Sequence, residues 1–498
     1  MKLTSYSTVA LALLAAGVEA RGQKRHSRNS ARAARLQRRC NETDVPPTST
    51  FDTAPIPTPT PTGDDSSSGG GSSSGATPFQ NWAGSNLYYA AGLNADQRAY
   101  LLGGLQKAGM KVLRVWLDGQ SSAGTKGTNI DAYPGLEPDN VGTFDDTVLN
   151  KLDDFMLDAQ KYGIKLMISM HSFNALSGGD VYNKKYGTQG FYENSEAQAA
   201  FDARLQHVLN YTHKTLGKRY AELSDYIFAF EAQNEAMIGL GEGYIQQHQD
   251  WQCNRAKAIK SALGDSHILI TTGGESWANE SVQDGFLNCD AIDIVALHAY
   301  GSGDFNTDGL KKYVDRAKSA GKMLVMQEWG ACYFDSANNN CQQSGVLDQG
   351  TRGNNIKNWG KQIIDSGMPW MYWCVLPNAD PHYGWDYEVG IDDQGWDAIL
   401  DASAYAASAQ SAWDFSPWLL GSGGDSTPSE TAAPTSAPTA TETAVPQPTI
   451  DAPAPPAATT GNFPKNKVFS GSKFVPFPHS HFPSISLRDF AACTTLRV

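Results

Sequence analysis

The sequence predicts an α/β fold, a (β/α)8 TIM barrel, within one long block of residues, 78–420. Eight short runs of β-branched, aliphatic or aromatic residues recur along this block, and stretches with apolar residues at helical spacing separate them. The runs are almost continuously apolar, which is typical of parallel strands that are buried on both faces. A doubly wound open sheet is the alternative, but no GxGxxG follows the first run and the chain has no P-loop sequence.

The eight predicted strands follow one another along the block. They cover residues 80–88, 111–117, 164–171, 226–235, 267–274, 291–300, 322–329 and 369–376. Predicted helices lie between them, for example 94–109, 144–163 and 195–217, and several end at a glycine, which commonly terminates a helix. This regular alternation of strand and helix favours the barrel.

The rest of the chain divides by composition. Residues 1–20 have the pattern of a secretory signal peptide, with a buried N-terminal helix as the alternative. Residues 21–40 are basic and end in an Arg-Arg pair, which indicates a propeptide with a dibasic processing site; a disordered basic arm is the alternative. Residues 41–77 and 421–461 are rich in Ser, Thr, Pro and Gly and are predicted to be linkers or glycosylated stalks. The tail, 462–498, matches no binding module and has no assigned role.

Charge narrows the range of partners. The chain has a formal net charge of −13, and the 78–420 block holds 25 Lys and Arg residues against 41 Asp and Glu. A field of that sign disfavours nucleic acid and anionic membrane surfaces, and it is compatible with a neutral polysaccharide. Beyond the first twenty residues, no apolar run approaches the length of a membrane span. We therefore expect a secreted, extracellular monomer with no nucleic-acid or membrane partner; attachment to the cell wall is an alternative.

Two further features fit a secreted glycoprotein. The candidate N-glycosylation sites are Asn41, Asn210 and Asn279. The block contains five of the seven cysteines and no CxxC pair, which removes the usual zinc-ribbon and thioredoxin interpretations. The candidate disulfides are Cys253–Cys289 and Cys332–Cys341. Cys374 lies inside an apolar run and is predicted to be a buried free thiol.

Polar and aromatic residues gather at the C-terminal ends of the predicted strands, where barrel enzymes place their active sites. They are Asn86, Arg114, Trp116, His171, Asn234, Glu235, His298, Tyr300, Glu328, Trp329 and Trp373. Glu235 and Glu328 are carboxylates on strands three apart. Such a pair suits glycosidic bond cleavage, because one acid protonates the leaving oxygen while the other attacks the sugar or activates water. A separation of ~5 Å would imply retention of configuration, and ~6.5–9.5 Å would imply inversion.

With these residues in this order, the block resembles glycoside hydrolase family 5 of clan A, which contains endo-cellulases and endo-β-1,4-mannanases. The resemblance covers nearly all of 78–420 and rests on Arg114, His171, Asn234, Glu235, His298, Tyr300, Glu328 and Trp373. It implies that Glu235 is the catalytic acid/base and Glu328 the nucleophile of a retaining reaction. One departure is visible: the family commonly has Asn-Glu-Pro, whereas Ala236 follows Glu235 here.

The resemblance also implies a set of substrate-binding residues. They are Arg114, His171, Asn234, His298, Tyr300 and Trp373. In this set Asn234 would bond the sugar 2-OH, and Trp373 would be a stacking platform. A nucleophile must be ionised, so Arg114 and a hydroxyl donor are expected to lower the pKa of Glu328, and the ionised Glu328 would favour a protonated acid. This chemistry requires no metal and no organic cofactor.

Each candidate also has a purely structural interpretation. Arg114 could pair with the buried Glu231, without excluding a catalytic role. His171 and His298 could be core histidines. Sugar stacking is expected only of Trp373 among the tryptophans, and the others considered as core aromatics are Trp116, Trp329, Trp385 and Trp396.

The substrate is the least constrained prediction. Segments 173–201 and 377–396 are rich in Tyr, Trp and Asp and resemble endo-mannanase loops. We expect an endo-acting hydrolase of a β-linked plant or fungal wall polysaccharide, with β-1,4-mannan ahead of β-glucan (cellulose or β-1,3/β-1,6-glucan) and galactan. A non-catalytic glycan-binding wall protein is the alternative from another class, but such a protein would need neither glutamate. A metal-dependent hydrolase is disfavoured, because no ligand-spaced aspartates accompany the two strand-end histidines.

Overall fold

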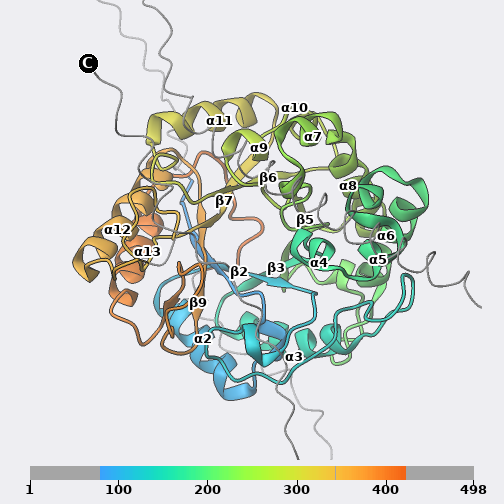
Figure 1. The fold of residues 1–498 in the computed structure, drawn as a ribbon, viewed down its shortest axis with the longest axis horizontal. Helices are drawn as coiled ribbons and strands as arrows, with labels where there is room; N and C mark the ends of the chain where they lie inside the picture. The colour runs from blue at the N-terminus through green and yellow to red at the C-terminus, as the bar shows by residue number, and fades with distance from the viewer. Residues whose placement is uncertain (1–78, 342–343, 422–498) are drawn as a thin grey trace, which may run out of the picture. The chain divides into compact units, whose positions relative to one another are not determined.

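The computed structural model describes residues 79–341 and 344–421. The predicted signal peptide, propeptide, both linkers and the C-terminal tail lie outside these residues, so those assignments remain predictions. The described residues form a closed barrel of eight parallel strands, paired in sequence order from β1 to β8. Helices surround the central strands, as Figure 1 shows. This confirms the predicted (β/α)8 fold.

Each barrel strand lies inside one of the eight predicted runs. The strands are β1 (Ala83–Asn86), β2 (Val112–Trp116), β3 (Lys165–Ser169), β4 (Ile227–Glu231), β5 (Leu269–Thr271), β6 (Ile294–Ala299), β7 (Met323–Trp329) and β8 (Trp370–Tyr372). The barrel closes where Ala83 of β1 pairs with Trp370 of β8. All eight strands are almost entirely buried, which explains their near-continuous apolar sequences.

The eighth predicted strand, residues 369–376, is longer than the barrel strand that the structure contains. β8 ends at Tyr372, and the peptide bond that follows Trp373, Trp373–Cys374, is cis. Val375–Leu376 then forms a separate strand, β9, which pairs in parallel with β10 (Val389–Gly390) outside the barrel. The apolar run therefore contributes strands to two sheets. The chain returns at Val389 and forms hydrogen bonds with the β9 segment there.

Twelve α-helices lie among the described residues. They are α2 (Ala95–Lys107), α3 (Thr147–Lys161), α4 (Phe173–Gly178), α5 (Val181–Glu193), α6 (Ser195–Asn210), α7 (Glu242–Gln247), α8 (Gln249–Leu263), α9 (Ala278–Ser281), α10 (Asp284–Leu287), α11 (Thr307–Ser319), α12 (Gln349–Asp365) and α13 (Trp396–Ser408).

The prediction that one helix reaches residue 217 is wrong. α6 ends at Asn210, because the next backbone is extended and Asp153 holds it by accepting from the Tyr211 hydroxyl and the Lys214 N–H.

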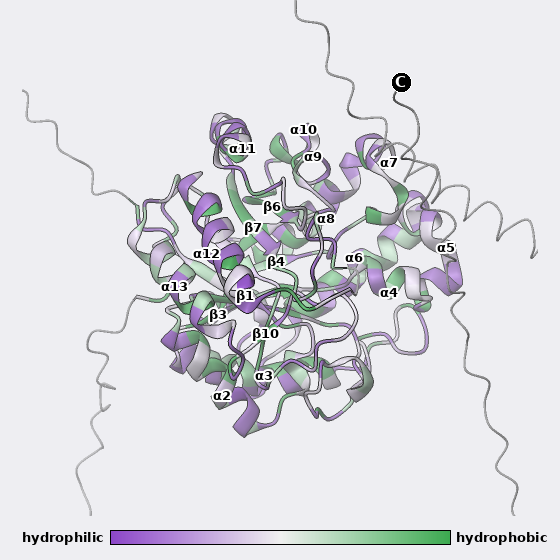
Figure 2. Cartoon of the chain, turned by 60° about the vertical axis from the view of Figure 1, so that its left-hand side comes forward, coloured by the Kyte–Doolittle hydropathy of each residue, from purple (hydrophilic) through white to green (hydrophobic). Residues whose placement is uncertain are grey.

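Apolar side chains fill the space between barrel and helices and also close one end of the barrel. In Figure 2 the barrel strands are mainly hydrophobic, and the surrounding helices carry hydrophilic residues on much of their surface. A second cluster joins the first residues of several strands, such as Val112 and Ile294, to Phe415 beyond α13. This cluster closes the N-terminal end of the barrel, so polar side chains inside it gather at the other end.

Two disulfides brace the fold, and both are as predicted. Cys253–Cys289 joins α8 to the segment before β6, and Cys332–Cys341 closes a loop after β7. Cys374 is a buried free thiol, also as predicted. Among the described residues, none of the helices combines the length and the apolar character that a bilayer crossing requires.

Candidate active site

The two candidate glutamates meet at the C-terminal end of the barrel, on either side of a buried histidine. Glu235 follows β4, and Glu328 lies near the end of β7. His298, on β6, lies between them: its Nδ1 is 3.0 Å from Glu235 Oε1 and 3.5 Å from Glu328 Oε2. One carboxylate oxygen of each glutamate and one ring nitrogen of His298 all lie within 4.8 Å of one another.

Two glycines after β5 allow this close approach. Gly274 has a φ of +66°, and a Cβ there would lie 2.2 Å from the His298 ring. A Cβ on Gly273 would lie 2.0 Å from the carbonyl oxygen of Gln233. The Gly273 carbonyl instead accepts a hydrogen bond from the Glu235 N–H at 3.1 Å. Because Glu235 itself has a φ of 49°, this bond helps to hold a backbone conformation that non-glycine residues rarely adopt.

Arg114 connects both sides of the site from inside the barrel. Its guanidinium contacts Glu231 through two hydrogen bonds, of 3.0 and 2.6 Å, and it contacts Glu328 at 2.5 Å. It also donates to the side-chain oxygen of Asn234 at 2.6 Å. The structural interpretation of Arg114 as a partner of Glu231 and the functional one as a partner of Glu328 therefore both hold.

A glutamine fixes the orientation of His298. Gln327 donates its amide NH2 group to Glu231 at 2.7 Å, so its amide oxygen faces His298 Nε2 at 2.9 Å. The imidazole must then carry hydrogen on Nε2, and its Nδ1 faces Glu235. Burial opposes the charged ring, but the carboxylates of Glu328 and Glu235 outweigh it and raise the pKa of His298 above its ordinary value. His298 can therefore exchange a proton with Glu235.

The electrostatics of Glu328 differ from the prediction. Arg114 and the Tyr300 hydroxyl contact its two oxygens, at 2.5 and 2.8 Å, as expected of groups that stabilise a carboxylate. Burial nevertheless raises the pKa of Glu328 above its ordinary value, although His298, Arg114 and Tyr300 oppose that rise. The predicted lowering is therefore wrong, because a carboxylate that is only 4% exposed loses most of its hydration.

Trp373 lies at the end of β8 and is partly buried. Its ring stacks on Tyr88 with centroids 5.8 Å apart, and its edge meets Trp116 at 5.6 Å. Tyr300, which bonds Glu328, packs against Tyr387 at 4.7 Å. Tyr300 is thus the aromatic residue that contacts Glu328, and Trp373 belongs to a group of rings at the C-terminal ends of β1, β2 and β8.

His171 occupies a different environment from His298. Both of its ring nitrogens bond to protein groups, Nε2 to Asp180 at 2.7 Å and Nδ1 to Gln233 at 2.9 Å. The residue is 1% exposed, and the rings of Tyr182 and Phe191 pack against it. The structure therefore does not bring His171 into hydrogen-bond contact with either candidate glutamate.

A match to a family model agrees with this geometry. Residues 72–379 match the model described as Cellulase (glycosyl hydrolase family 5), which is more than half of the chain. The chain belongs to glycosyl hydrolase family 5. It is therefore a glycosidase, as its sequence predicts.

Curated relatives and a solved structure that resemble this chain have the names of mannan-cleaving enzymes. The chain is 29% identical over 338 residues to the probable mannan endo-1,4-beta-mannosidase A of Aspergillus oryzae, covering 63% of this chain and 81% of the relative. It is 27% identical over 329 residues to the mannan endo-1,4-beta-mannosidase A of Aspergillus aculeatus, covering 60% and 80%. The endo-beta-1,4-mannanase from Thermotoga petrophila matches its fold with a TM-score of 0.53 at 19% identity, covering 66% of this chain and 77% of that one.

Inspection of the strand ends missed two buried residues that interact with the candidate site. Gln327 directly precedes Glu328 and connects Glu231 with His298 through two hydrogen bonds, which the sequence alone does not reveal. Glu275 follows the two glycines after β5, where strand-end inspection could have found it. It is 1% exposed, and neither of its carboxylate oxygens has a hydrogen-bond partner. Burial and the carboxylates of Glu235 and Glu280 raise the pKa of Glu275 well above its ordinary value.

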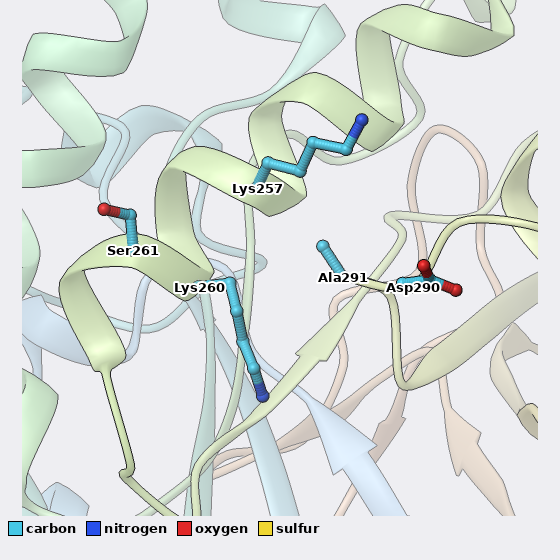
Figure 3. A pocket seen from close by; sticks show the side chains of 5 residues that line it. All are labelled: Lys257, Lys260, Ser261, Asp290 and Ala291. Carbon is cyan, nitrogen blue, oxygen red and sulfur yellow. The ribbon is translucent and has the colours of Figure 1, made fainter.

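Two surface hollows lie near the barrel. One, of about 330 Å³, is lined by Lys257, Lys260, Ser261, Asp290 and Ala291 (Figure 3). It lies beside the start of β6, whereas His298 is near the end of that strand, so it is not part of the family 5 site. The other, of about 210 Å³, includes Asp118 after β2 and His171 after β3, at the same end of the barrel as the glutamates.

Two groups of side chains in the described part of the chain come close enough to share a metal ion. One is Glu235 with His298 and Glu328, but Arg114 already contacts Glu328 at 2.5 Å and shares its charge between Glu328 and Glu231. The other consists of Asp380, His382 and Asp386. The sequence interpretation that considered only strand ends overlooked this second group, because all three residues lie on the one loop between β9 and β10.

Proposed function

We propose that the chain is a secreted, endo-acting β-1,4-mannanase that cleaves its substrate with retention of configuration. The observation that carries the mechanism is the approach of Glu235 and Glu328, which have carboxylate oxygens within 4.8 Å of each other. Retaining glycosidases hold their carboxyl groups about 5–5.5 Å apart, whereas inverting enzymes need about 6.5–9.5 Å to admit a water molecule. The short separation supports retention.

In the proposed reaction Glu328 attacks the anomeric carbon while Glu235 gives a proton to the departing glycosidic oxygen. Water then attacks the anomeric carbon of the resulting glycosyl ester. Glu235 takes the proton from that water, and Glu328 leaves as a carboxylate. The neighbours of Glu328 fit this role, because Arg114 and Tyr300 direct hydrogen bonds at its two oxygens.

We assign substrate contacts to two further residues, Asn234 and Trp373, and supporting roles to two histidines. Arg114 occupies the side-chain oxygen of Asn234, which leaves the amide NH2 group to donate to a sugar hydroxyl. Trp373, which directly follows β8, offers an aromatic ring at the same end of the barrel as the glutamates for stacking on a sugar. His298 moves or holds a proton at Glu235. For His171 we propose an indirect role: its bond to Gln233 holds the segment that leads into Asn234 and Glu235.

The choice of mannan rests on the curated relatives, whose names include mannan endo-1,4-beta-mannosidase. Secretion rests on the predicted signal peptide, together with two disulfides and two exposed sequon asparagines, Asn210 and Asn279. The third sequon, at Asn41, lies outside the described residues. The acidic block, with 41 Asp and Glu against 25 Lys and Arg, supports an uncharged polysaccharide as the partner.

Incubation of the secreted protein with mannan, glucomannan, carboxymethyl-cellulose, laminarin, pustulan and β-galactan tests this function. We expect reducing ends to appear from mannan and to disappear in Glu328→Gln, which keeps the size of the side chain. Proton NMR of the first products should show the β-anomer. Activity on a glucan or galactan alone would reject mannan, and early α-anomer would reject retention. No activity on any of the six would favour the glycan-binding alternative.

A further inference from the structure

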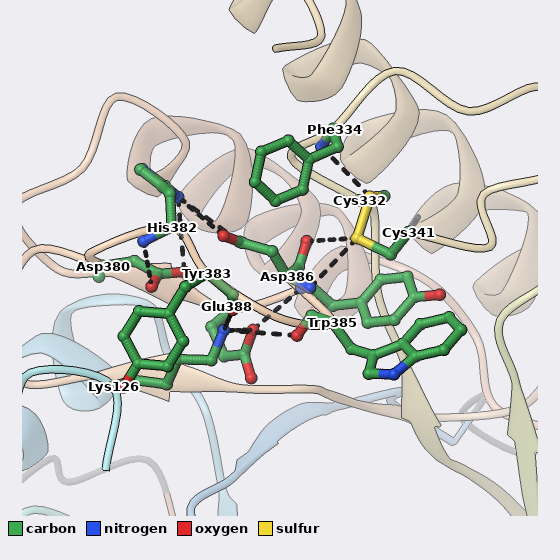
Figure 4. Close-up of polar contacts among 12 residues, drawn as sticks. Lys126, Cys332, Phe334, Cys341, Asp380, His382, Tyr383, Trp385, Asp386 and Glu388 are labelled. Carbon is green, nitrogen blue, oxygen red and sulfur yellow. Dashed lines mark hydrogen bonds and ion pairs between the residues drawn. A yellow bond between two sulfur atoms is a disulfide. The ribbon is translucent and has the colours of Figure 1, made fainter. Parts of the chain in front are cut away.

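A second acidic cluster lies in the loop between β9 and β10. Asp380 and Asp386 have fully buried side chains, whereas the His382 side chain is 26% exposed. Figure 4 shows the three side chains converging, with His382 directed at both aspartates. One donor atom from each of the three lies within 4.8 Å of the other two.

The distances within the cluster are those of loose ion pairs and exceed those of charge-assisted hydrogen bonds. His382 Nδ1 is 3.3 Å from Asp386 Oδ2 and 3.6 Å from Asp380 Oδ2. Charge-assisted N–H···O bonds are about 2.7–2.9 Å long. Donors around a tetrahedral ion at 2.0–2.1 Å are instead about 3.3–3.4 Å apart, as simple trigonometry requires. The observed spacing fits donors that surround an ion better than donors that bond one another.

One oxygen of Asp380 accepts no N–H hydrogen bond in the described structure. Asp380 Oδ1 accepts a hydrogen bond from the His382 N–H at 3.0 Å. Asp380 Oδ2 is buried, has no hydrogen-bond partner and faces the imidazole. Leaving a buried carboxylate oxygen unpaired is costly, so a ligand at this point would remove the cost.

The charge around the cluster is also unbalanced. Lys126 is 3.0 Å from Glu388 and also donates to the carbonyl of Tyr383, so its charge is largely taken by Glu388. The two buried aspartates then share His382 and the more distant charge of Lys126. A divalent cation would balance both aspartates.

We propose that Asp380, His382 and Asp386 bind a zinc ion that fixes the loop between β9 and β10. One imidazole nitrogen and two carboxylate oxygens are a donor set that zinc accepts, and the exposed edge of His382 admits water as the fourth ligand. Calcium and magnesium prefer oxygen ligands alone and more of them. The proposal does not depend on the substrate of the barrel.

The surroundings would hold the ligands in place. The Tyr333 ring stacks on the His382 imidazole with centroids 3.5 Å apart, and the Tyr333 N–H bonds the Asp386 carbonyl at 2.8 Å. The Asp386 N–H in turn donates to Cys341 Sγ at 3.2 Å, so the disulfide after β7 supports this loop. Such outer contacts orient metal ligands and strengthen binding. Between the ligands the loop carries Tyr383 and Trp385, whose side chains are exposed.

The test measures zinc binding by the full chain after it has been stripped with a chelator. Isothermal titration and elemental analysis should find one zinc per chain that depends on this loop, and zinc should raise the Tm by several degrees. Asp380→Asn and His382→Ala should weaken binding at this site by more than about 100-fold, because loss of outer contacts alone costs 10–100-fold. His382 is partly exposed, so its replacement should fold even if Asp380→Asn does not.

Glu328→Gln is the matched control, because it removes a carboxylate from the other candidate group. It should retain the zinc. Several outcomes would overturn the proposal: no zinc bound by the wild type, equal binding by all variants, loss of zinc only in Glu328→Gln, or tighter binding of calcium than of zinc. Cobalt(II) provides a geometric check. The intense visible absorption of a tetrahedral ion is expected, and the pale spectrum of an octahedral ion would contradict the proposed coordination.

Discussion

The barrel cluster (Glu235, His298, Glu328) and the loop cluster (Asp380, His382, Asp386) have the same chemical groups, two carboxylates and one imidazole. Their construction differs. The barrel cluster takes one residue from each of three elements and is connected by hydrogen bonds to Arg114 and Gln327. The loop cluster lies within seven consecutive residues, and one of its buried oxygens has no hydrogen bond.

This difference separates two uses of the same groups. In the barrel cluster a permanent cation and oriented donors stabilise charge that moves during a reaction, so a proton can pass between His298 and Glu235. In the loop cluster the nearest permanent cation, Lys126, forms its ion pair with Glu388 and not with either aspartate, which suits the binding of a further cation. Replacing charged or ionisable side chains of the barrel tests this comparison. The expected effects are given from the largest to the smallest.

The largest effect should come from Glu235→Gln, which keeps the shape of the cluster and removes its transferable proton. Hydrolysis of mannan should fall about 10²–10⁴-fold, the usual contribution of general acid–base catalysis. A 2,4-dinitrophenyl β-mannobioside needs no protonation of its leaving group, so formation of the covalent intermediate should be nearly preserved. Added azide should restore turnover and give a β-glycosyl azide, which mass spectrometry and NMR can identify.

The control for this variant is Glu242→Gln, at the start of α7 in the same β4–β5 connection. It should leave both substrates unaffected. If Glu235→Gln slows the activated and the natural substrate by the same factor, with no rescue by azide, Glu235 is not the acid/base. The barrel cluster would then lose the property that distinguishes it from the loop cluster.

The sequence predicted the barrel well because each strand is buried on both faces and is therefore continuously apolar. It also located Glu235, His298 and Glu328, because parallel strands place their ends at one mouth. It could not show that Arg114 contacts Glu231 and Glu328 together, or that burial outweighs Arg114 at Glu328. Those results depend on distances of a few ångströms between residues more than 100 positions apart.

The loop between β9 and β10 shows the limit of pattern reading more clearly. Trp385 was interpreted as a core aromatic, but it is 64% exposed, so that interpretation is wrong. The residues of the loop cluster were passed over because no strand ends there. Loops have no hydrophobic period that fixes the direction of their side chains, so the burial of Asp380 and Asp386 follows from tertiary contacts alone.

A smaller effect is expected from Arg114→Lys, which should weaken the ion pair with Glu328. The barrel cluster would then resemble the loop cluster more closely. Lysine cannot form the forked contact with Glu231 and reach Glu328 together. Because Arg114 opposes the rise in the pKa of Glu328, weakening it should raise that pKa further. The acid limb of the kcat/KM profile should therefore move to higher pH, with kcat/KM reduced about 10–100-fold at neutral pH.

Arg204→Lys is the matched control, because Arg204 also forms a buried pair, with Glu137 at 2.9 Å. Both variants should unfold at lower urea concentration. Only Arg114→Lys should move the acid limb. An acid limb that stays in place in Arg114→Lys, with kcat/KM reduced equally at every pH, would mean that Arg114 supports the fold without tuning Glu328.

The smallest effect is expected from Glu275→Gln, and it concerns stability. Glu275 is a buried carboxyl whose oxygens have no hydrogen-bond partner, so it resembles Asp380 of the loop cluster more than its neighbour Glu235. Its pKa is raised in the folded protein, so the folded state keeps a proton that the unfolded state releases. Stability should therefore fall as pH rises from the ordinary glutamate range toward the raised pKa.

Glutamine has no proton to lose, so Glu275→Gln should be more stable than the wild type at neutral pH. The advantage should shrink by about 1.4 kcal/mol for each pH unit as the pH decreases toward the ordinary glutamate range. Urea unfolding at several pH values measures this slope. A difference that does not vary with pH would show that Glu275 is ionised in the folded state and paired with a cation. In that case Glu275 would be evidence for a second binding position beside the acid/base, and the contrast between a barrel cluster paired with an arginine and a loop cluster without such a pair would no longer hold.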